Sequence, residues 1–446
     1  MRYTMAKIGM ITLGCEKNRV DAEMMLAALR ARGFELAEDV AMGDVAIVNT
    51  CGFIDAAKQE SIEEILELAK LKEEGRIRAI VVTGCMAQRY QEQIAEELPE
   101  VDAVVGIGAN AEIADVIERV LEGEKLQRFP DKQKLPLNGE RVQSTLSYFS
   151  YLKIAEGCDN CCTYCAIPMI RGGFRSRRME DILKEAETLA ENGVKELMVI
   201  AQDTTRYGED LYGQLKLPEL LHKLCKIDGL QWIRVLYCYP DRLTDELLET
   251  IASEEKIVKY LDLPLQHCNS RVLKTMNRHG NREALTALLK KVRNKIPGVA
   301  LRTTFIVGFP GETEEEFSEL AEFANEIRFE RMGCFAYSQE EGTPAARLPG
   351  QLDDEVKNRR QELMMEQQMR IMEEHNQKKI GKTITVLTEG FDRYAECWFG
   401  RSSADAPEVD GKVFFTPKTR KPILGQFTQV TVTDCMDCDL IGEMAE

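Results

Sequence analysis

Four cysteines within eight residues constrain the fold of this chain more than any other feature of its sequence. They lie between Glu156 and Pro168 and include the spacing Cys-x3-Cys-x2-Cys at Cys158, Cys162 and Cys165. Three thiolates on a cubic [4Fe-4S] cluster leave one iron without a protein ligand, and an open coordination position is where a metal site does chemistry. The segment predicts such a cluster loop. Cys161 is expected to be a bystander, although it remains a candidate ligand.

Three other interpretations of these cysteines are weaker. Buried core cysteines are common, but here polar residues stand between them. A zinc site would need the pairs Cys158/Cys161 and Cys162/Cys165 to lie about a dozen residues apart, so that the chain can wrap the ion, and here they abut. A disulfide framework is disfavoured because 446 residues can bury a full core and no signal peptide is recognisable.

A second set of cysteines follows the predicted strands of the first hundred residues. Short β-branched runs at 7–13, 45–49 and 79–83 alternate with amphipathic stretches at 21–32 and 61–70, a βαβαβ pattern that predicts a parallel sheet. The three strands lead, in the same register, to Cys15, Cys51 and Cys85. Because parallel strands bring their carboxyl ends to one edge, the sequence predicts a second three-thiolate site and a second [4Fe-4S] cluster.

The rest of the chain predicts two further domains in an α/β protein. Strands expected at 151–155, 196–201, 232–237, 259–263, 299–307 and 331–336 alternate with helices and indicate a partial (β/α)6 barrel, with the cluster loop at its carboxyl end. After a charged helix over 354–377, short strands at 383–388, 395–400, 412–415 and 426–433 predict a small β-barrel. The expected domains are 6–122 for the N-terminal βαβ domain, 123–147 for a linker, 148–377 for the central barrel and 378–446 for the C-terminal barrel.

Several smaller motifs are open to more than one interpretation. The turn containing Gly308, Pro310 and Gly311 follows the fifth barrel strand and leads to Thr313 as a helix cap; it is either a ligand-binding turn or an ordinary strand-to-helix connection. The segment 202–206 offers polar groups for a ligand, although Asp203 is equally expected as a cap. The remaining candidates are the basic residues Arg171, Arg175, Arg177 and Arg178 as a phosphate contact or a solvated face, His267 and His279 as structural residues, and Cys435 and Cys438 as surface thiols.

Charge and composition limit the classes of partner. The formal net charge is -17, and residues 378–446 hold nine Lys/Arg against eleven Asp/Glu. Such a balance disfavours stable DNA binding and broad affinity for nucleic acid, which need a basic face, and it suits a basic protein partner. We expect a cytoplasmic enzyme with no membrane association, because no apolar stretch is long enough to span a bilayer. The C-terminal barrel lies outside both cysteine motifs, so we expect truncation after Gln377 to leave the cluster chemistry intact but to impair modification of a macromolecular substrate.

With these motifs in view, the whole chain resembles the methylthiotransferases of the radical S-adenosylmethionine (SAM) superfamily, with a C-terminal TRAM domain. Within that family it resembles the RimO branch, which modifies an aspartate of the twelfth small-subunit ribosomal protein. The segments that carry the resemblance are Leu13–Asn18 with Asp21 and Glu23, Asn49–Ile54, Glu156–Asp159 leading to Pro168, Ile170–Gly172, Arg175–Arg177 and Gly400–Ser402 leading to Glu408. Two positions depart from the branch: Glu16 stands where proline is usual and Cys161 where a polar residue is usual.

The resemblance implies a mechanism and a set of partners. Cys15, Cys51 and Cys85 would hold an auxiliary [4Fe-4S] cluster whose open iron carries the sulfur, and one SAM would methylate that sulfur. Cys158, Cys162 and Cys165 would hold the cluster that cleaves a second SAM to a radical, which abstracts hydrogen from the aspartate β-carbon. No side-chain acid or base is expected to act. The implied partners are the ribosomal protein, or the subunit carrying it, and an electron donor, with Gly308, Pro310 and Gly311 as SAM contacts.

Two other functions remain open at the level of sequence. The first is methylthiolation of a tRNA adenosine, but that branch usually reads Gln-Met-Asn after the first cysteine, where this chain has Glu16-Lys17-Asn18. The second is a structural zinc or iron–sulfur protein without turnover. The motif after Cys15 favours the protein substrate.

Overall fold

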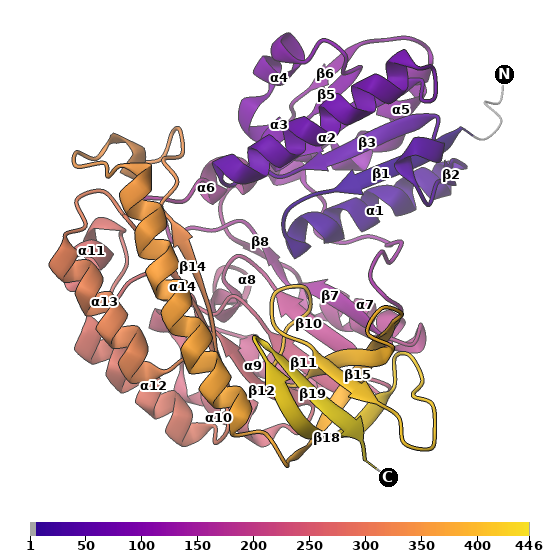
Figure 1. Ribbon diagram of the computed structural model, residues 1–446. Helices are drawn as coiled ribbons and strands as arrows, with labels where there is room; N and C mark the ends of the chain where they lie inside the picture. The colour runs from indigo at the N-terminus through magenta and orange to yellow at the C-terminus, as the bar shows by residue number, and fades with distance from the viewer. Residues whose placement is uncertain (1–5, 446) are drawn as a thin grey trace.

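The computed structural model describes residues 6–445 as three packed domains that follow one another along the chain (Figure 1). Glu446, the last residue of the expected C-terminal domain, lies outside the described residues. The N-terminal domain is drawn in indigo and violet, the central domain runs from magenta to orange, and the C-terminal domain is yellow. The α/β fold class and all three predicted architectures are confirmed.

The N-terminal domain is a six-stranded parallel sheet with helices on both faces. Alternate residues of β3 and β4 pack on opposite faces: Val45, Ile47 and Val81 against α1 and α5, and Ala46 and Val48 against α2 and α3. This two-sided burial explains why the strands read as nearly continuous apolar runs. The sheet has the order β2-β1-β3-β4-β5-β6. Its elements are β1 (Lys7–Thr12), α1 (Glu16–Arg32), β2 (Glu35–Leu36), β3 (Val45–Thr50), α2 (Asp55–Glu73), β4 (Ala79–Gly84), α3 (Cys85–Tyr90), α4 (Glu92–Glu97), β5 (Ala103–Val105), α5 (Ile113–Leu121) and β6 (Leu126–Arg128).

The sixth strand lies inside the segment 123–147 where the sequence predicts only a linker. Leu126–Arg128 pairs in parallel with β5 and so extends the first sheet beyond residue 122. Two of its three residues are exposed, so the strand has no apolar alternation from which it could be recognised.

The central domain is a curved, open sheet of six parallel strands in the order β14-β13-β12-β11-β10-β7. Its strands are β7 (Phe149–Lys153), β10 (Glu196–Ile200), β11 (Trp232–Val235), β12 (Ile257–Asp262), β13 (Ala300–Val307) and β14 (Arg331–Ala336). The helices are α6 (Ile167–Arg171), α7 (Met179–Glu191), α8 (Glu209–Tyr212), α9 (Leu217–Leu224), α10 (Asp245–Ser253), α11 (Ser270–Thr275), α12 (Arg282–Lys295), α13 (Glu314–Ile327) and α14 (Asp354–Gln377). A two-stranded ribbon of β8 (Ala155–Glu156) and β9 (Arg175–Ser176) frames the cluster loop.

The C-terminal domain is a closed barrel in the order β15-β16-β17-β19-β18. Its strands are β15 (Thr383–Asp392), β16 (Cys397–Ser402), β17 (Val413–Thr416), β18 (Phe427–Met436) and β19 (Asp439–Met444). The sequence analysis missed β19, which pairs with both β17 and β18 and closes the barrel. Cys435 and Cys438 flank the β18–β19 turn and are partly exposed, as expected for thiols near the surface.

The three domains share one apolar core on the inner face of the central sheet. Tyr151, Met198 and Tyr260 point inward from the strands and pack with Val20 of the N-terminal domain and Ala406 of the C-terminal domain. The C-terminal barrel therefore lies over the concave side of the central sheet, whereas the long helices cover its convex side. Within residues 6–445, no helix combines the length and apolarity needed to cross a bilayer.

Candidate active site

The three strand-end cysteines of the N-terminal domain meet at one edge of its sheet. Strand pairing aligns Thr12 of β1 with Asn49 of β3, and Asn49 with Thr83 of β4. Each cysteine follows its aligned residue by two or three positions, so all three lie at the same edge of the sheet. Gly14 has a φ of 83°, and a Cβ atom there would lie 2.7 Å from the Cys51 sulfur. The glycine before Cys15 is therefore needed for the close approach of Cys51.

A buried asparagine holds these strand ends together. The Nδ2 group of Asn18 donates hydrogen bonds to the carbonyl oxygens of Leu13 at 2.8 Å, Asn49 at 3.2 Å and Thr50 at 3.3 Å. In return, the Asn49 side chain donates to the Asn18 carbonyl at 2.9 Å. The residues that precede Cys15 and Cys51 are thereby fixed relative to each other.

Burial and mutual charge act on the thiols of this triplet. Burial, together with the nearby thiols of Cys15 and Cys51, raises the pKa of Cys85 to about 12, although the guanidinium of Arg171 acts to lower it. Burial also raises the pKa of Cys51. A metal ligand must be a thiolate, so loading this site displaces protons and requires a strongly cationic centre.

The central cysteine loop directs hydrogen-bond donors at the sulfurs of its predicted ligands. The backbone N–H of Asn160 donates to the Cys158 sulfur at 3.5 Å, and that of Ile167 donates to the Cys165 sulfur at 3.5 Å. The third sulfur, that of Cys162, accepts from Nη1 of Arg278 at 3.8 Å. Such donors are typical of the surroundings of iron–sulfur ligands.

Cys161 differs from its neighbours. Its thiol is exposed and its backbone has a φ of 51°, a left-handed conformation that a non-glycine residue rarely adopts. The Nδ2 group of Asn277 donates to its carbonyl oxygen at 3.1 Å and helps to hold that conformation. The turned backbone carries the Cys161 thiol toward solvent, whereas Cys158, Cys162 and Cys165 are partly or fully covered.

The segments that carry the two cysteine triplets are in contact where α3 packs against α6. Cys85 begins α3, and its side chain packs with Ala166, which follows Cys165 directly, and with Ile170, one turn further along α6. Arg171, at the end of α6, donates from Nη2 to the Cys85 sulfur at 3.5 Å. Segments 70 or more residues apart in sequence are thus in contact around one region of the molecule.

The donor set fits two cubic clusters better than one mononuclear ion. No group of three His, Cys, Asp or Glu side chains in residues 6–445 is close enough to hold a single metal ion. Three thiolates of a cubane each bind a different iron, so they stand further apart than the ligands of one ion. Three cysteines at each site match the number of protein ligands on a cluster with one open iron.

Comparisons with known proteins agree with this geometry. Residues 7–106 match an uncharacterized protein family, UPF0004, residues 152–324 match the radical SAM superfamily, and residues 380–445 match the TRAM domain. A protein from Thermoanaerobacter sp. (strain X514), named ribosomal protein uS12 methylthiotransferase RimO, is 49% identical over 98% of this chain and 100% of its own length. Its namesakes from Pelotomaculum thermopropionicum and Clostridioides difficile are 51% and 48% identical, covering 98% and 99% of this chain and 99% of each relative.

This chain belongs to the RimO family of radical SAM methylthiotransferases. The family uses SAM and [4Fe-4S] clusters. Among solved structures, the radical SAM methyltransferase TsrM from Kitasatospora setae, with cobalamin and a [4Fe-4S] cluster bound, superposes with a TM-score of 0.58 at 14% identity. The match covers 76% of this chain and 77% of that one, and it shows a shared fold.

In this RimO-family chain, local packing explains why glycines occupy the turn after β13. Gly308 has a φ of 71°, and a Cβ atom there would lie 2.4 Å from the Lys357 side chain on α14. Gly311 donates its N–H to the Gly350 carbonyl at 2.7 Å, and Pro310 is buried. The next helix, α13, begins with a capping box between Thr313 and Glu316, so the predicted Thr cap is confirmed. The turn lies at the carboxyl end of β13, but these contacts alone account for its glycines.

Polar groups at the carboxyl ends of other barrel strands lack partners. The side-chain oxygens of Gln202, after β10, and Gln266, after β12, are buried and accept no hydrogen bond within residues 6–445. Gln266 also has a φ of 69°. Sequence reasoning identified the segment of Gln202 but missed Gln266, because neither its backbone conformation nor its lack of a partner is visible in sequence.

Asp203 supports the cluster loop and does not cap a helix. Although it occupies the N-cap position of a short 3-10 turn, it makes no capping hydrogen bond. Its carboxylate instead accepts from Nδ2 of Asn160 at 2.9 Å and from Arg242 at 3.3 Å. Asp203 thereby fixes a residue located between Cys158 and Cys162.

The basic residues after the cluster loop do not form one solvated face. Arg171 and Arg177 are almost completely buried, and Arg177 forms an ion pair with Glu185 at 2.6 Å. Only Arg178 is largely exposed among the ion-paired members of this group. Neither the phosphate site nor the solvated face expected from the sequence describes Arg171 and Arg177, because tertiary ion pairs neutralise both.

The two candidate histidines have structural surroundings. Burial lowers the pKa of His267 to about 3, and its Nδ1 atom accepts from the backbone N–H of Asn269 at 3.0 Å. His279 is exposed and lies 3.1 Å from Asp241. His267 is therefore neutral at physiological pH.

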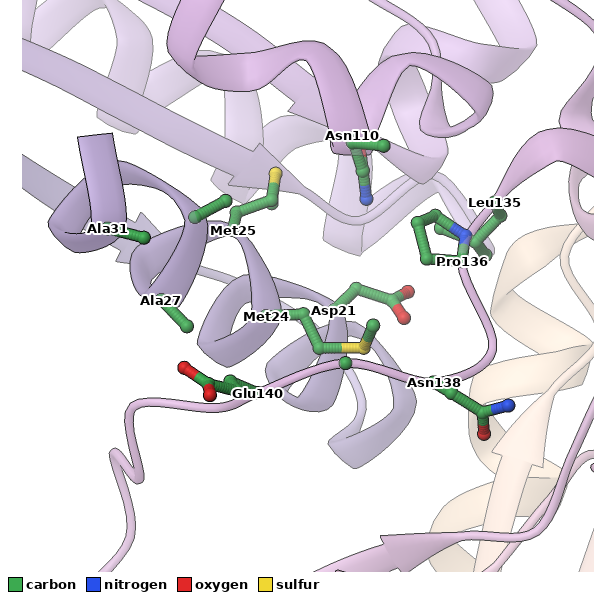
Figure 2. A pocket seen from close by; sticks show the side chains of 13 residues that line it. Asp21, Met24, Met25, Ala27, Ala31, Asn110, Leu135, Pro136, Asn138 and Glu140 are labelled. Carbon is green, nitrogen blue, oxygen red and sulfur yellow. The ribbon is translucent and has the colours of Figure 1, made fainter. Parts of the chain in front are cut away.

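A cavity of ≈ 260 Å³ lies beside this region, between α1 and residues 135–140 (Figure 2). Met24 and Met25 give it an apolar wall, and Asp21, which accepts a hydrogen bond from Arg171, also lines it. None of the six predicted cysteine ligands contributes to its lining. The cavity is therefore adjacent to the candidate active site and not part of it.

Proposed function

We propose that this methylthiotransferase modifies the β-carbon of an aspartate in the ribosomal protein uS12. One structural observation carries the proposal: the segments that hold the two cysteine triplets are in contact where α3 packs against α6. The substrate follows from relatives about half identical over the full chain that are named for uS12. Methylthiolation of tRNA is disfavoured by the same relatives and by the net charge of -17.

The proposed ligands are Cys15, Cys51 and Cys85 for the auxiliary cluster, and Cys158, Cys162 and Cys165 for the SAM-cleaving cluster. When bound, the clusters and two SAM molecules supply a radical, a sulfur atom and a methyl group, so that methylthio replaces one hydrogen. The protein must then hold the substrate carbon between the triplets and exclude water. No side-chain acid or base is assigned, because His267 is neutral and buried in a structural contact.

Lys17 is the proposed partner of the substrate carboxylate. It lies on the first turn of α1, two residues after Cys15, and its ammonium stands 3.3 Å above the Tyr237 ring beyond β11. Only 7% of its side chain is exposed, and its carboxylate partner is the adjacent Glu16 at 3.4 Å, which also accepts from the Tyr237 hydroxyl at 2.7 Å. An incoming carboxylate in so buried a place requires a cation.

Binding of SAM is proposed at the carboxyl ends of the barrel strands. The unpartnered oxygens of Gln202 and Gln266 support this location, since a bound ligand would satisfy them. The backbone of Gly308, Pro310 and Gly311 belongs to the same edge and is kept as a proposed contact. An electron donor and a cytoplasmic location complete the proposal, and the negative net charge suits a basic protein substrate.

Iron analysis and substrate mass together test this function. Anaerobic reconstitution should give about eight irons per chain, because two cubanes hold about four each. Replacing Cys158, Cys162 and Cys165 should halve the iron and abolish SAM cleavage. Replacing Cys15, Cys51 and Cys85 should also halve the iron content, but SAM should still be cleaved without formation of the methylthiolated product. A variant without the central triplet that still cleaves SAM would contradict the ligand assignment.

A further inference from the structure

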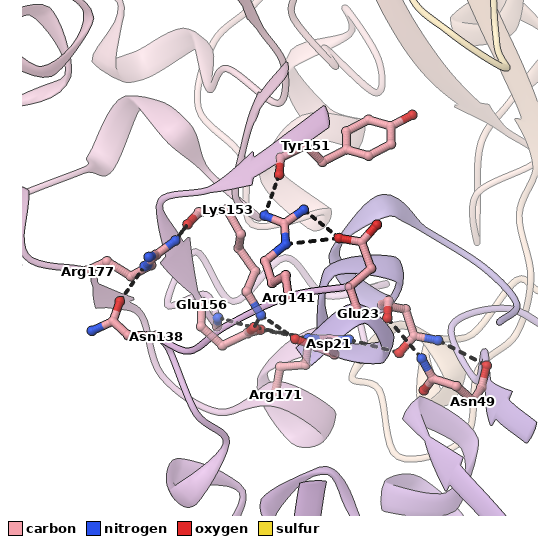
Figure 3. Close-up of polar contacts among 12 residues, drawn as sticks. Asp21, Glu23, Asn49, Asn138, Arg141, Tyr151, Lys153, Glu156, Arg171 and Arg177 are labelled. Atoms are coloured by element: carbon pink, nitrogen blue, oxygen red, sulfur yellow. Dashed lines mark hydrogen bonds and ion pairs between the residues drawn. The ribbon is translucent and has the colours of Figure 1, made fainter. Parts of the chain in front are cut away.

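The side chain of Arg171 is buried and contacts Asp21 of the N-terminal domain and Glu156 of the central domain (Figure 3). Its Nη1 group donates to the two carboxylate oxygens of Glu156 at 3.0 and 3.1 Å and to Asp21 at 2.9 Å. Its Nη2 group donates to Oδ1 of Asn18 at 3.4 Å and to the Cys85 sulfur at 3.5 Å. One planar guanidinium therefore binds carboxylates with one amino group and the thiol with the other.

Three partners of Arg171, namely Cys85, Glu156 and Asn18, belong to or directly support a cluster loop. Glu156 precedes Cys158 by two residues and its Oε1 accepts from the Gly157 N–H at 3.2 Å. Asn18 fixes the strand ends before Cys15 and Cys51. A continuous chain of hydrogen bonds thus runs from Cys85 through Arg171 to the segment that carries Cys158.

The charges around Arg171 are balanced without solvent. Lys153 forms ion pairs with Asp21 and, at 2.8 Å, with Glu156, so two cations face two carboxylates. All four side chains are at most 1% exposed. Buried ion pairs add little net stability, since desolvation offsets their attraction. Stability therefore gives no sufficient reason for this group, whereas its contact with a ligand sulfur points to the cluster.

We infer that Arg171 positions the auxiliary cluster against the SAM-cleaving loop and raises the reduction potential of the auxiliary cluster. A cationic donor on a ligand sulfur stabilises the reduced, more negative state of a cluster, and hydrogen bonds to sulfur are a known determinant of such potentials. Arg171 is a positioning residue, because it acts through Cys85 and Glu156. The inference rests on the proposed assignment of Cys15, Cys51 and Cys85 as ligands.

The experiment measures the potential of the auxiliary cluster alone. The full-length chain with Cys158, Cys162 and Cys165 replaced by alanine is reconstituted with iron and sulfide and titrated anaerobically, with EPR as the readout. In this background, the double variant Glu156→Gln with Arg171→Gln removes the guanidinium that donates a hydrogen bond to the Cys85 sulfur. It also removes one positive and one negative charge, so the local charge stays balanced. Arg171→Lys keeps the positive charge but replaces the planar guanidinium with a single ammonium group. The matched control is Glu23→Gln with Arg141→Gln, which removes another buried pair, at 2.6 Å, whose arginine contacts no sulfur.

We expect the reduction potential of the auxiliary cluster in the double glutamine variant to be more negative by at least about 59 mV. For a one-electron couple this corresponds to a tenfold change in the equilibrium constant for reduction. Arg171→Lys should shift it in the same direction by less, and the control should not shift it. Unchanged potentials in both Arg171 variants, or an equal shift in the control, would overturn the inference. Loss of the auxiliary iron from both Arg171 variants, while the control variant still binds iron, would also overturn the inference. Arg171 would then be needed for cluster assembly and not for setting the potential. A background protein that binds no iron would instead refute the ligand assignment.

Discussion

Cys161 differs in backbone conformation from its neighbour Cys162, which is a proposed cluster ligand. Both Cys161 and Cys162 lie in a loop that could coordinate a cluster, but the φ of 51° at Cys161 turns its thiol to solvent. The sulfur of Cys162 instead faces Arg278. The sequence spacing predicts this division, and the local structure supplies its physical reason.

Serine substitutions at these two positions should therefore have opposite results. Cys161→Ser should retain about eight irons per chain and full SAM cleavage, because no cluster contact is lost. Cys162→Ser should lose about half the iron and all SAM cleavage. Iron analysis and deoxyadenosine formation measure both effects. Loss of half the iron in Cys161→Ser would show that the wrong cysteine was chosen.

Replacement of Lys17 should affect the substrate more than SAM. Lys17→Met removes the proposed partner of the aspartate carboxylate, and a charge-assisted hydrogen bond is worth about 1.5–3 kcal/mol. We expect kcat/KM for uS12 to fall about tenfold to a hundredfold, with uncoupled SAM cleavage retained. Lys72→Met, which removes a lysine paired with Asp102 at 2.6 Å, is the control and should leave kcat/KM unchanged. Equal values for both variants would exclude Lys17 from substrate binding.

At the scale of elements, periodicity located the long strands and helices and missed short or closing ones. The predicted strand at 331–336 and helix at 354–377 coincide with β14 and α14. The missed β6 is a three-residue edge strand, and β19 completes the barrel by pairing with its hairpin neighbour β18 and, in parallel, with β17. α6 has only five residues, so its role in joining the two triplets depends on tertiary packing that sequence patterns do not record.

The short helix α3 connects Cys85 with a second contact between domains. Arg89 on α3 donates to Glu340 of the central domain at 2.7 Å and to the Gly52 carbonyl, beside Cys51, at 2.9 Å. Lys58 lies 3.3 Å from the same carboxylate, which is 2% exposed. Glu340 therefore balances two cations at the interface.

Neutralising that carboxylate should weaken the interface. Glu340→Gln leaves Arg89 without a carboxylate partner and Lys58 with Asp55 as its remaining one, at 3.1 Å. Losing one partner of a buried pair costs about 3 kcal/mol or more. We expect a lower thermal unfolding midpoint in anaerobic scanning calorimetry. Glu341→Gln is the matched control, because that exposed residue binds Arg89 through its backbone carbonyl alone. Equal midpoints for the two variants would contradict the proposed importance of the contact.

At the scale of the whole molecule, the C-terminal barrel completes the central domain. Arg401 pairs with Glu196 of β10 at 2.7 Å, Arg331 of β14 pairs with Asp405, and Asp410 accepts from Tyr260 of β12 at 2.7 Å. Truncation after Gln377 would remove the carboxylate of Asp405 from Arg331, leave Glu196 with Arg234 as its remaining arginine, and expose the shared apolar core. The contacts thus argue against the separability expected from sequence, and we predict that the truncated chain unfolds at lower denaturant concentration than the full chain.

The same interface predicts a dependence of stability on pH. Burial raises the pKa of Glu196, but the charges of Arg401 and Arg234 outweigh it and hold the pKa below its usual range. A carboxyl group with a lowered folded-state pKa stabilises the fold above about pH 4.5, and this contribution is lost as the pH falls further. Glu196→Gln should therefore be less stable than the parent at pH 7 by about 3 kcal/mol. The gap in urea unfolding should narrow below about pH 4.5, and a constant gap would contradict the ion-pair explanation.

The most direct test of the account is a competition between its two possible substrates. The reconstituted enzyme, with SAM and a reductant under anaerobic conditions, is offered uS12 and tRNA in the same reaction, and both are digested and read by mass spectrometry. The account predicts a methylthio group on one aspartate of uS12 and unmodified tRNA, with less product as salt screens the acidic enzyme from its basic substrate. Methylthioadenosine in the tRNA digest together with unmodified uS12 would contradict it.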